Sequence, residues 1–469
     1  MIHRWVESPS VYFAGAVILL LVIVALQFDL RVPSRSRGTA EDLALLRTRG
    51  DLNVVFILID TLRADRLSLY GYERQTTPVI DDLANHGIVF ERVIAQSSWT
   101  KTSMASLWTG TYPAAHGVLR FDNAIPDEAV MPAEIFKAAG YRTVGIWRNG
   151  WVAPNFGFAQ GFDVYYTPKA GVDAQLQRHS PGVASIGGTD EDVYLAARDF
   201  LEHFGQEKFF LYLHLMDLHQ YVFDDDADAF GPTYSDAYDK ALDWTDRVIG
   251  AVVEALDAVD VLPRTVIAIS SDHGEAFLEH GREGHAYDLH REVVEVPFVI
   301  IPPLILDRGI RVSETVANID VWPTLLDLVG LPPLPGVDGR SMLPLILATA
   351  ESAPDRVSSD LTRPVISHLD QNWGGRAEPR EWVSLTDGDA RLILQRDHPN
   401  SVEFYDSSTD PWEATNRSAE SPPALQPMVE RIDRYLKDSK APWGVESPTI
   451  EVDELRLNQL RALGYRVGS

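Results

Sequence analysis

The sequence predicts an α/β protein with a large, mainly parallel sheet that is covered by helices on both faces. Continuous apolar, β-branched runs such as NVVFILI (Asn53–Ile59) recur along the chain. Such runs are typical of strands that are buried on both faces of a parallel sheet. Amphipathic helical patterns lie between these runs, and this alternation of strand and helix favours parallel pairing.

Length, charge and composition limit the function classes. The chain has 469 residues, which fits one large domain with a smaller appendage. Its net charge of -27, from 68 acidic and 41 basic residues, argues against binding to nucleic acid. The sequence contains no cysteine, so disulfides, thiolate metal sites and cysteine nucleophiles are excluded.

The N-terminal region predicts a membrane anchor followed by a linker. Residues 8–28 carry no charge, and about 20 apolar positions are enough to cross a bilayer. We therefore assign residues 1–30 to a transmembrane anchor; a signal peptide and a buried core helix are the alternatives. The arginines after this span argue against export of the following domain. Residues 31–50 read as a polar linker with a short helix at 41–48.

Residues 51–350 are predicted to form the main α/β domain. The helix that begins at Pro78 follows Thr77 and ends before Gly87, a combination that marks both helix ends. Further buried strands are predicted at 143–147, Phe209–Leu215, Thr265–Ser270 and 296–301. Further amphipathic helices are predicted at 189–204, 235–259 and 319–329.

Residues 351–469 are predicted to form a smaller C-terminal unit. Four short strand patterns are separated by Asp-Gly and Pro-Asn turns, which favours an antiparallel sheet. A helix at 423–436 would pack on that sheet, and a tail helix is predicted at 449–464. The predicted strands lie at 364–369, 381–385, 390–395 and 402–405.

Acidic residues follow two of the predicted buried strands. Asp60 comes directly after Asn53–Ile59, and Asp272 with His273 comes shortly after Thr265–Ser270. Ligands collect at the carboxyl ends of strands in open α/β sheets. Two carboxylates and an imidazole suit a divalent cation such as Zn²⁺ or Mn²⁺, although each aspartate could also cap the turn that follows it.

Thr100 is the candidate nucleophile. It precedes a helical pattern that ends at Gly110, so it would lie at a helix N-terminus, where negative charge is favoured. A bound cation would lower the cost of forming the alkoxide. The alternative role for this threonine is an ordinary helix cap.

Three histidines follow the predicted strands and fit a pocket for anion transfer. His219 comes after Phe209–Leu215, while His280 and His285 lie in the loop after Asp272. Imidazoles at this edge of the sheet can stabilise charge on a transferring phosphoryl or sulfuryl group and protonate a leaving group.

The chain resembles the sulfatase family of the alkaline phosphatase superfamily over most of its length, from about residue 53 to about 436. The resemblance implies an alkaline phosphatase-like fold. The segments that carry it are NVVFILIDTLRADRLSLYGY, SSWTKTSMASLWTGTYP, FGFAQGFD, LHLMDLH, SSDHGEAFLEHGREGH, IDVWPTLLDLVGLPPLPGVDGRSMLPL and FYDSSTDPWEATN.

The resemblance implies specific roles for these residues. The metal would be held by Asp60, Asp272 and His273, with Thr100 as a further ligand. His219 and His285 would contact the transferred group. The cofactor expected is one divalent ion, Zn²⁺ or Mn²⁺ before Ca²⁺ or Mg²⁺. We expect three neighbouring residues to contact the substrate: Lys101, Asn149 and His280.

Several positions depart from the family pattern. Thr100 stands where formylglycine sulfatases carry Cys or Ser, so it cannot be converted to formylglycine by the usual route. Thr102 and Met104 replace the proline and arginine of that motif. Thr61 stands where many members have a second metal aspartate. In having a threonine at the nucleophile position, the chain resembles the phospho-group transferases and phosphodiesterases of the superfamily.

Three functions remain open at this point. The first is a membrane-anchored hydrolase of sulfate or phosphate esters, including phosphodiesters and phosphonates, that forms a covalent intermediate on Thr100. The second is a transferase that passes the group to a lipid or glycan hydroxyl. The third is a non-catalytic, membrane-tethered binding protein. By resemblance, we expect a single-pass protein of the cell membrane with its catalytic domain outside the cytoplasm.

Overall fold

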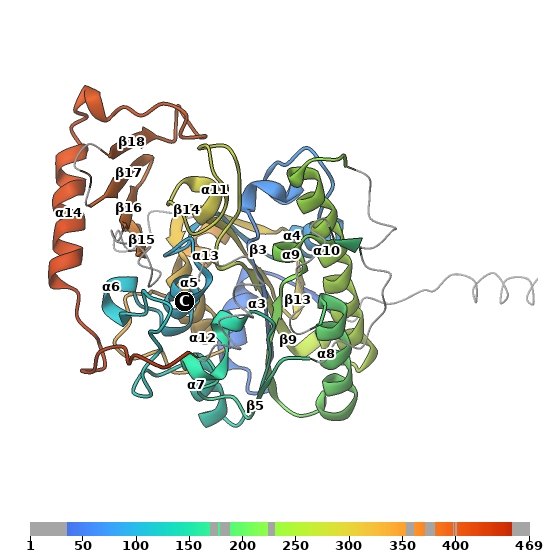
Figure 1. Cartoon of the computed structure of the whole chain (residues 1–469). Coiled ribbons are helices and arrows are strands. Elements are labelled where there is room, and N and C mark those ends of the chain that lie inside the picture. Colours follow the sequence, from blue (N-terminus) through green and yellow to red (C-terminus); the bar gives the residue numbers. More distant parts are fainter. Residues whose placement is uncertain are drawn as a thin grey trace, which may run out of the picture.

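A computed structural model of the chain describes residues 35–168, 177–178, 188–223, 230–352, 361–370, 380–396, 398 and 401–452. A central eight-stranded sheet has the strand order β14-β3-β12-β9-β2-β7-β4-β5. Figure 1 shows this sheet between layers of helices. Its strands are β2 (Asn53–Ile59), β3 (Ile88–Ile94), β4 (Arg142–Ile146), β5 (Val164–Tyr166), β7 (Phe209–Leu215), β9 (Thr265–Ser270), β12 (Glu295–Ile301) and β14 (Ile310–Ala317).

The sheet is parallel in one half and mixed in the other. β2 lies between β7 and β9 and pairs in parallel with both, and β4 and β5 continue in the same direction. β12 is antiparallel to both β9 and β3, while β14 is parallel to β3. All seven residues of β2 are buried, as its continuous apolar sequence predicts. The predicted α/β class with a mixed central sheet is confirmed.

Helices cover both faces of this sheet and enclose two apolar cores. One core includes side chains of α4 (Pro78–Asn85), α8 (Asp190–Phe204) and α10 (Tyr234–Ala258). The other face is covered by α3 (Ala40–Leu45), α5 (Thr100–Thr109), α7 (Pro132–Ala138), α12 (Val321–Leu328) and α13 (Leu343–Ala350). Shorter elements named below are α9 (Asp217–Gln220), α11 (Arg291–Val294), β10 (Ala276–Phe277) and β11 (Glu283–Gly284).

A second, four-stranded antiparallel sheet lies beside the main domain, with α14 along it (Figure 1). Met428 and Ile432 of α14 pack against the apolar face of this sheet. The N–H of His368 donates to the carbonyl of Gln96 at 2.8 Å, which joins this sheet to the main domain. The predicted C-terminal sheet and helix are therefore present as β15 (Val365–Asp370), β16 (Glu381–Asp387), β17 (Ala390–Gln395), β18 (Val402–Asp406) and α14 (Leu425–Asp438).

The described part of the predicted linker is packed against the main domain. β1 (Ser36–Gly38) pairs in parallel with β13 (Leu304–Leu306), and Leu43 of α3 is fully buried. The helix expected at 41–48 is present as α3, which Thr39 begins with a capping box. The described part of this segment therefore contributes to the fold.

The predicted single-pass membrane protein requires correction. Across the described residues, no helix combines the length and the apolar composition that crossing a bilayer requires. The longest helix among them, α10, is amphipathic and carries charged side chains along its length. Residues 8–28, where the anchor was expected, lie outside the described residues, as does nearly all of the tail helix predicted at 449–464.

Candidate active site

Asp60, Asp272 and His273 meet at the carboxyl edge of the parallel half of the sheet. β2 and β9 are paired neighbours, so the residues that follow them lie side by side. Nε2 of His273 lies 3.3 Å from Oδ2 of Asp272 and 4.0 Å from Oδ1 of Asp60. All three residues are fully buried.

One oxygen of Asp60 is held by hydrogen bonds and the other is not. Asn149 Nδ2 donates to Oδ2 at 2.7 Å, and His214 Nε2 lies 3.2 Å from the same oxygen. Oδ1 is buried without a hydrogen-bond partner. Tyr212 Oη lies 2.9 Å from Nδ1 of His214, so a Tyr212 hydroxyl that donates there leaves His214 Nε2 as the donor to Asp60.

Asp272 shows the same asymmetry. Its Oδ1 accepts hydrogen bonds from the N–H groups of Thr61 (3.3 Å) and His273 (2.9 Å), while its Oδ2 is buried without a hydrogen-bond partner. Thr61 holds a left-handed backbone, with φ of 64°, which is uncommon for a branched residue. This strained turn directs the Thr61 N–H toward Asp272.

The charges of these groups call for a cation between them. Burial and the charge of Asp60 raise the pKa of Asp272 well above its usual range. Burial lowers the pKa of His273 to about 3, so its ring is neutral near pH 7. His273 Nδ1 lies 2.9 Å from the Gly274 carbonyl and donates to it, which leaves a lone pair on Nε2.

Two orphaned carboxylate oxygens and this imidazole nitrogen lie within 4.8 Å of one another. Carboxylate oxygen and neutral imidazole are the donor types that Zn²⁺ and Mn²⁺ accept. The residues present therefore fit the divalent ion expected from the sequence.

Thr100 lies beside this group as the first residue of α5. Its Oγ1 is 3.1 Å from His273 Nε2 and 3.5 Å from Asn149 Nδ2. The first N–H groups of a helix lack intrahelical partners and favour negative charge on this side of the residue. The structure thus places the threonine hydroxyl among the candidate metal ligands.

His219 and His285 extend the site away from His273. The ring of His285 lies 4.4 Å from that of His273 and 5.1 Å from that of His219, between ring centroids. Nδ1 of His285 faces the carboxylate of Glu275 at 3.2 Å. Burial lowers the pKa of His285 to about 4 and raises that of Glu275 to about 7.

Lys101 points away from these groups. Its Nζ donates to the carbonyl oxygens of Phe121 (2.7 Å) and Arg120 (3.3 Å), and it lies 3.6 Å from the ring centroid of Phe156. Burial lowers the pKa of this amine well below its usual range. The structure therefore brings together all the expected site residues except Lys101 and His280.

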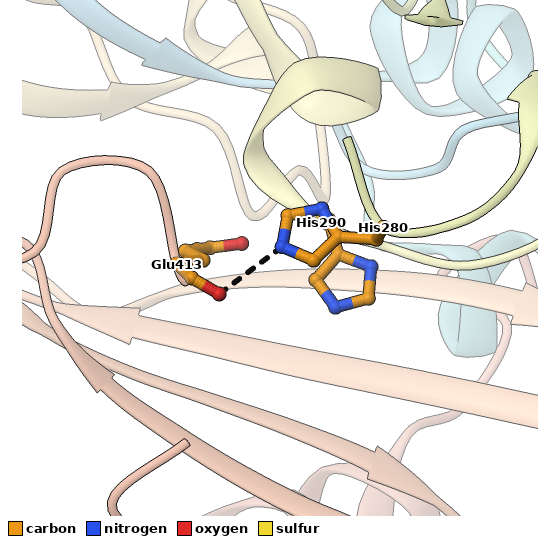
Figure 2. A group of neighbouring side chains, drawn as sticks. All are labelled: His280, His290 and Glu413. Carbon is orange, nitrogen blue, oxygen red and sulfur yellow. Dashed lines mark hydrogen bonds between the residues drawn. The ribbon is translucent and has the colours of Figure 1, made fainter. Parts of the chain in front are cut away.

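His280 lies in a second cluster, where the loop after β10 meets the C-terminal unit. Its ring stacks on that of His290 with centroids 3.7 Å apart and planes 5° apart, beside Glu413 (Figure 2). Two parallel rings at this spacing cannot both direct an in-plane lone pair at one ion. We therefore assign no metal to this cluster.

Hydrogen-bond partners explain how the two stacked rings are held. Three of the four ring nitrogens have oxygen partners at hydrogen-bond geometry, and the fourth, Nδ1 of His290, is buried near Asp288 without a hydrogen bond. His280 faces Glu292 Oε1 (2.7 Å) and the Glu413 carbonyl (3.1 Å). His290 faces Glu403 Oε2 (2.8 Å) and Asp288 Oδ1 (3.1 Å). The carboxylates raise the pKa of His290 to about 10 despite its burial.

His214 was not among the site residues expected from the sequence. This residue lies within the apolar run of β7, beside β2, and its side chain reaches Asp60. A histidine one residue from the end of a strand that adjoins the Asp60 strand was the available signal. The contact between His214 and Asp60 depends on how β2 and β7 are paired, and this register cannot be read from the sequence.

Comparison with known proteins places this geometry in context. Residues 52–331 match the family model described as Sulfatase. Arylsulfatase K of Gallus gallus is 31% identical over 195 residues, covering 41% of this chain and 34% of that protein. The ulvan-active sulfatase of Formosa agariphila is 25% identical over 437 residues, covering 84% of this chain and 82% of that protein.

A solved structure shares the fold. The phosphonate monoester hydrolase of Agrobacterium radiobacter superposes with a TM-score of 0.66 at 18% identity, covering 82% of this chain and 95% of that one. The match to arylsulfatase K spans only about a third of that protein's length. The structural match therefore shows a shared fold over most of the described chain.

Proposed function

This chain belongs to the sulfatase family, and we propose that it is a metal-dependent hydrolase of sulfate or phosphate esters with Thr100 as its nucleophile. One observation carries the proposal: Oγ1 of Thr100 lies 3.1 Å from Nε2 of His273, beside two orphaned carboxylate oxygens. A threonine with a purely structural role would not need buried, unpartnered acceptors next to its hydroxyl.

Asp60, Asp272 and His273 would hold the metal ion. When bound, that ion would act as a Lewis acid that favours negative charge on nearby oxygen atoms. Carboxylates and a neutral imidazole favour Zn²⁺ or Mn²⁺, and Ca²⁺ and Mg²⁺ are the alternatives.

Thr100 would attack phosphorus or sulfur from the N-terminus of α5. The hydroxyl proton leaves to solvent, the bond from Oγ1 to the transferred atom forms, and the bond to the leaving oxygen breaks. Asn149 Nδ2, 3.5 Å from Oγ1, is placed to donate to an oxygen of the transferred group.

The leaving oxygen needs a proton, and His219 or His285 would supply it. Burial lowers the pKa of both residues in the free protein. An anionic substrate bound beside them favours the imidazolium form, because opposite charge raises the pKa of a histidine. Water would then attack the threonine ester, its hydroxide adding to the transferred atom and its proton going to the Thr100 oxygen. This step releases sulfate from a sulfate ester, a phosphate monoester from a phosphodiester or a phosphonate from a phosphonate monoester, and it restores the hydroxyl.

The charges around the site favour an ester group with a single negative charge. Lys101 binds backbone carbonyls, and the guanidinium of Arg148 is paired with Asp190 and Asp217. Met104 occupies the position of the family arginine. Sulfate monoesters, phosphodiesters and phosphonate monoesters carry one such charge. We therefore propose that these esters are preferred over phosphate monoesters, which carry two charges. The ester group would belong to a small molecule or a glycan.

Assays on nitrophenyl esters test this proposal. Purified protein is mixed with Mn²⁺ or Zn²⁺ and a nitrophenyl sulfate, phosphonate, phosphodiester or phosphate monoester. We expect turnover of at least one singly charged ester, faster than that of the phosphate monoester and abolished by chelation. Preference for the phosphate monoester would contradict the charge argument. Undiminished turnover in Thr100→Ala would contradict the nucleophile assignment.

A further inference from the structure

A buried arginine links two segments that carry active-site residues. Arg148 follows β4, is fully buried, and directly precedes Asn149. Its Nη1 lies 2.5 Å from Asp190 Oδ1 and 2.6 Å from Asp217 Oδ1. Its Nη2 donates to the Gly188 carbonyl at 2.6 Å and to Gln220 Oε1 at 3.2 Å.

These contacts hold both ends of α9. Asp217 is the first residue of this helix and Gln220 is the last, and His219 lies between them. A helix of four residues is too short to be stable by itself. The position of His219 above the sheet therefore depends on the contacts of its two neighbours with Arg148.

The carboxylates of this group are also bound by other elements. Asp217 Oδ2 accepts from Trp244 Nε1 and from the N–H of Asp190, both at 2.9 Å. Asp190 accepts from the N–H groups of Met216 (2.7 Å) and Asp217 (3.1 Å). Since each partner is fixed in turn, removal of the guanidinium would leave two buried carboxylates close together and uncompensated.

The same arginine also fixes the backbone position from which the Asn149 side chain extends. Asn149 is its chain neighbour, and Asn149 Nδ2 lies 2.7 Å from Asp60 Oδ2 and 3.5 Å from Thr100 Oγ1. The Asn149 amide is oriented by its Oδ1, which accepts from the Trp151 N–H at 2.9 Å. Arg148 thus connects the nucleophile side of the site to the histidine side.

We propose that Arg148 is a positioning residue that sets the distance between Asn149 and His219. It does not contact the substrate, because its Nη atoms are occupied by four protein oxygens and its side chain is fully buried. The inference rests on the proposed function, in which Asn149 acts on the transferred group and His219 on the leaving oxygen.

The leaving group provides a readout that a purely structural role would not affect. Cleavage of a phenyl ester needs a proton on the leaving oxygen, because phenoxide is a poor leaving group. Cleavage of a nitrophenyl ester needs this proton far less, because nitrophenoxide is a weaker base. Displacement of His219 should therefore slow phenyl esters more than nitrophenyl esters. A general loss of folded protein would reduce both rates by the same factor.

The test compares Arg148→Met, Arg148→Lys and Gln220→Met on matched phenyl and nitrophenyl esters. For Arg148→Met we expect kcat to fall about 100-fold on the phenyl ester and only several-fold on the nitrophenyl ester, with KM nearly unchanged. Arg148→Lys should recover part of the loss. Gln220→Met removes a neutral contact, so it keeps the inference testable if Arg148→Met does not fold, and it should show the same selectivity on a smaller scale.

Asp246→Asn is the matched control. Asp246 is a buried aspartate of α10 whose carboxylate accepts from the N–H groups of Val79 and Ile80 at the start of α4. Its loss should lower stability with equal effects on both esters. An equal loss on both esters in the Gln220 and Arg148 variants would overturn the positioning role. Absence of any Thr100-dependent turnover in the wild type would instead overturn the proposed function.

Discussion

The Oγ1 atom of Thr100 lies 3.1 Å from Nε2 of His273, although the two residues are 173 positions apart in the chain. The contact joins the start of α5 to the turn after β9. Because Nδ1 of His273 donates to Gly274, its Nε2 presents a lone pair to the same space as the threonine hydroxyl.

Asn149→Ala should impair both chemistry and metal binding. Loss of a donor near the developing negative charge is expected to lower kcat by about 100-fold. Loss of the hydrogen bond to Asp60 should weaken metal affinity about tenfold, because it orients a ligand. Steady-state kinetics across a metal titration separate the two effects.

The control for this variant is Asn123→Ala. Asn123 Oδ1 accepts from the N–H groups of Leu119 and Arg120 in a surface loop, so its loss should change neither parameter. Wild-type kcat in Asn149→Ala at saturating metal would show that Asn149 plays no part in the chemistry.

Asp272→Asn should change stability in opposite directions with and without metal. In chelator, wild-type Asp272 is a buried carboxyl beside Asp60, and both effects raise its pKa. A raised acid pKa lowers stability as pH rises above the unfolded pKa of about 3.9, so near pH 7 the neutral amide should stabilise the apo protein by about 1–3 kcal/mol.

With Zn²⁺ or Mn²⁺ present the order should reverse, since the wild type gains binding energy that the variant lacks. Denaturant unfolding with chelator and with metal measures both values. Equal stability of the two proteins under both conditions would show that Asp272 does not bind a cation.

The stacked histidines predict a loss of stability at alkaline pH. The folded pKa of His290 is about 10, above an unfolded value of about 6.5. A raised histidine pKa gives stability that is fully present below pH 6.5 and is lost as pH rises toward 10. We expect the wild type to lose about 2 kcal/mol over this window from the His290 contribution, and His290→Gln to lose markedly less.

Urea unfolding at pH 6 and pH 9.5 measures this difference. His203→Gln is the control, because His203 lies on the exposed surface of α8. Parallel pH profiles for wild type and His290→Gln would show that the stacked pair is not held by its charge.

The buried strands were the most predictable part of the fold. The bounds expected for β2, β7 and β9 match the structure, because continuous apolar runs bounded by polar residues leave little choice of length. β3 was not predicted, because two charged residues, Glu91 and Arg92, interrupt its apolar pattern. Glu91 is exposed and Arg92 is half-buried. The antiparallel setting of β12 also depends on tertiary packing that local sequence does not encode.

The site residues that could be predicted are those that directly follow a buried strand. Asp60, Asp272 and His273 follow paired strands, so their proximity follows from topology. The placement of Lys101 and His280 could not be read from the sequence. The carbonyls of Arg120 and Phe121 hold the lysine, and the C-terminal unit holds the histidine. In both cases the partner residues are too far away in the sequence for a local pattern to indicate the contact.

The most direct test of the central claim is the mass of the protein during turnover. Enzyme is mixed with excess nitrophenyl ester and metal, quenched in acid within milliseconds, and digested for peptide mass analysis. We predict that the transferred sulfuryl or phosphoryl group is found on Thr100, that Thr100→Ala carries no such group, and that Thr102→Ala, whose hydroxyl binds the Val118 carbonyl, retains it. An active protein with an unmodified Thr100, and equal turnover by Thr100→Ala, would contradict the account.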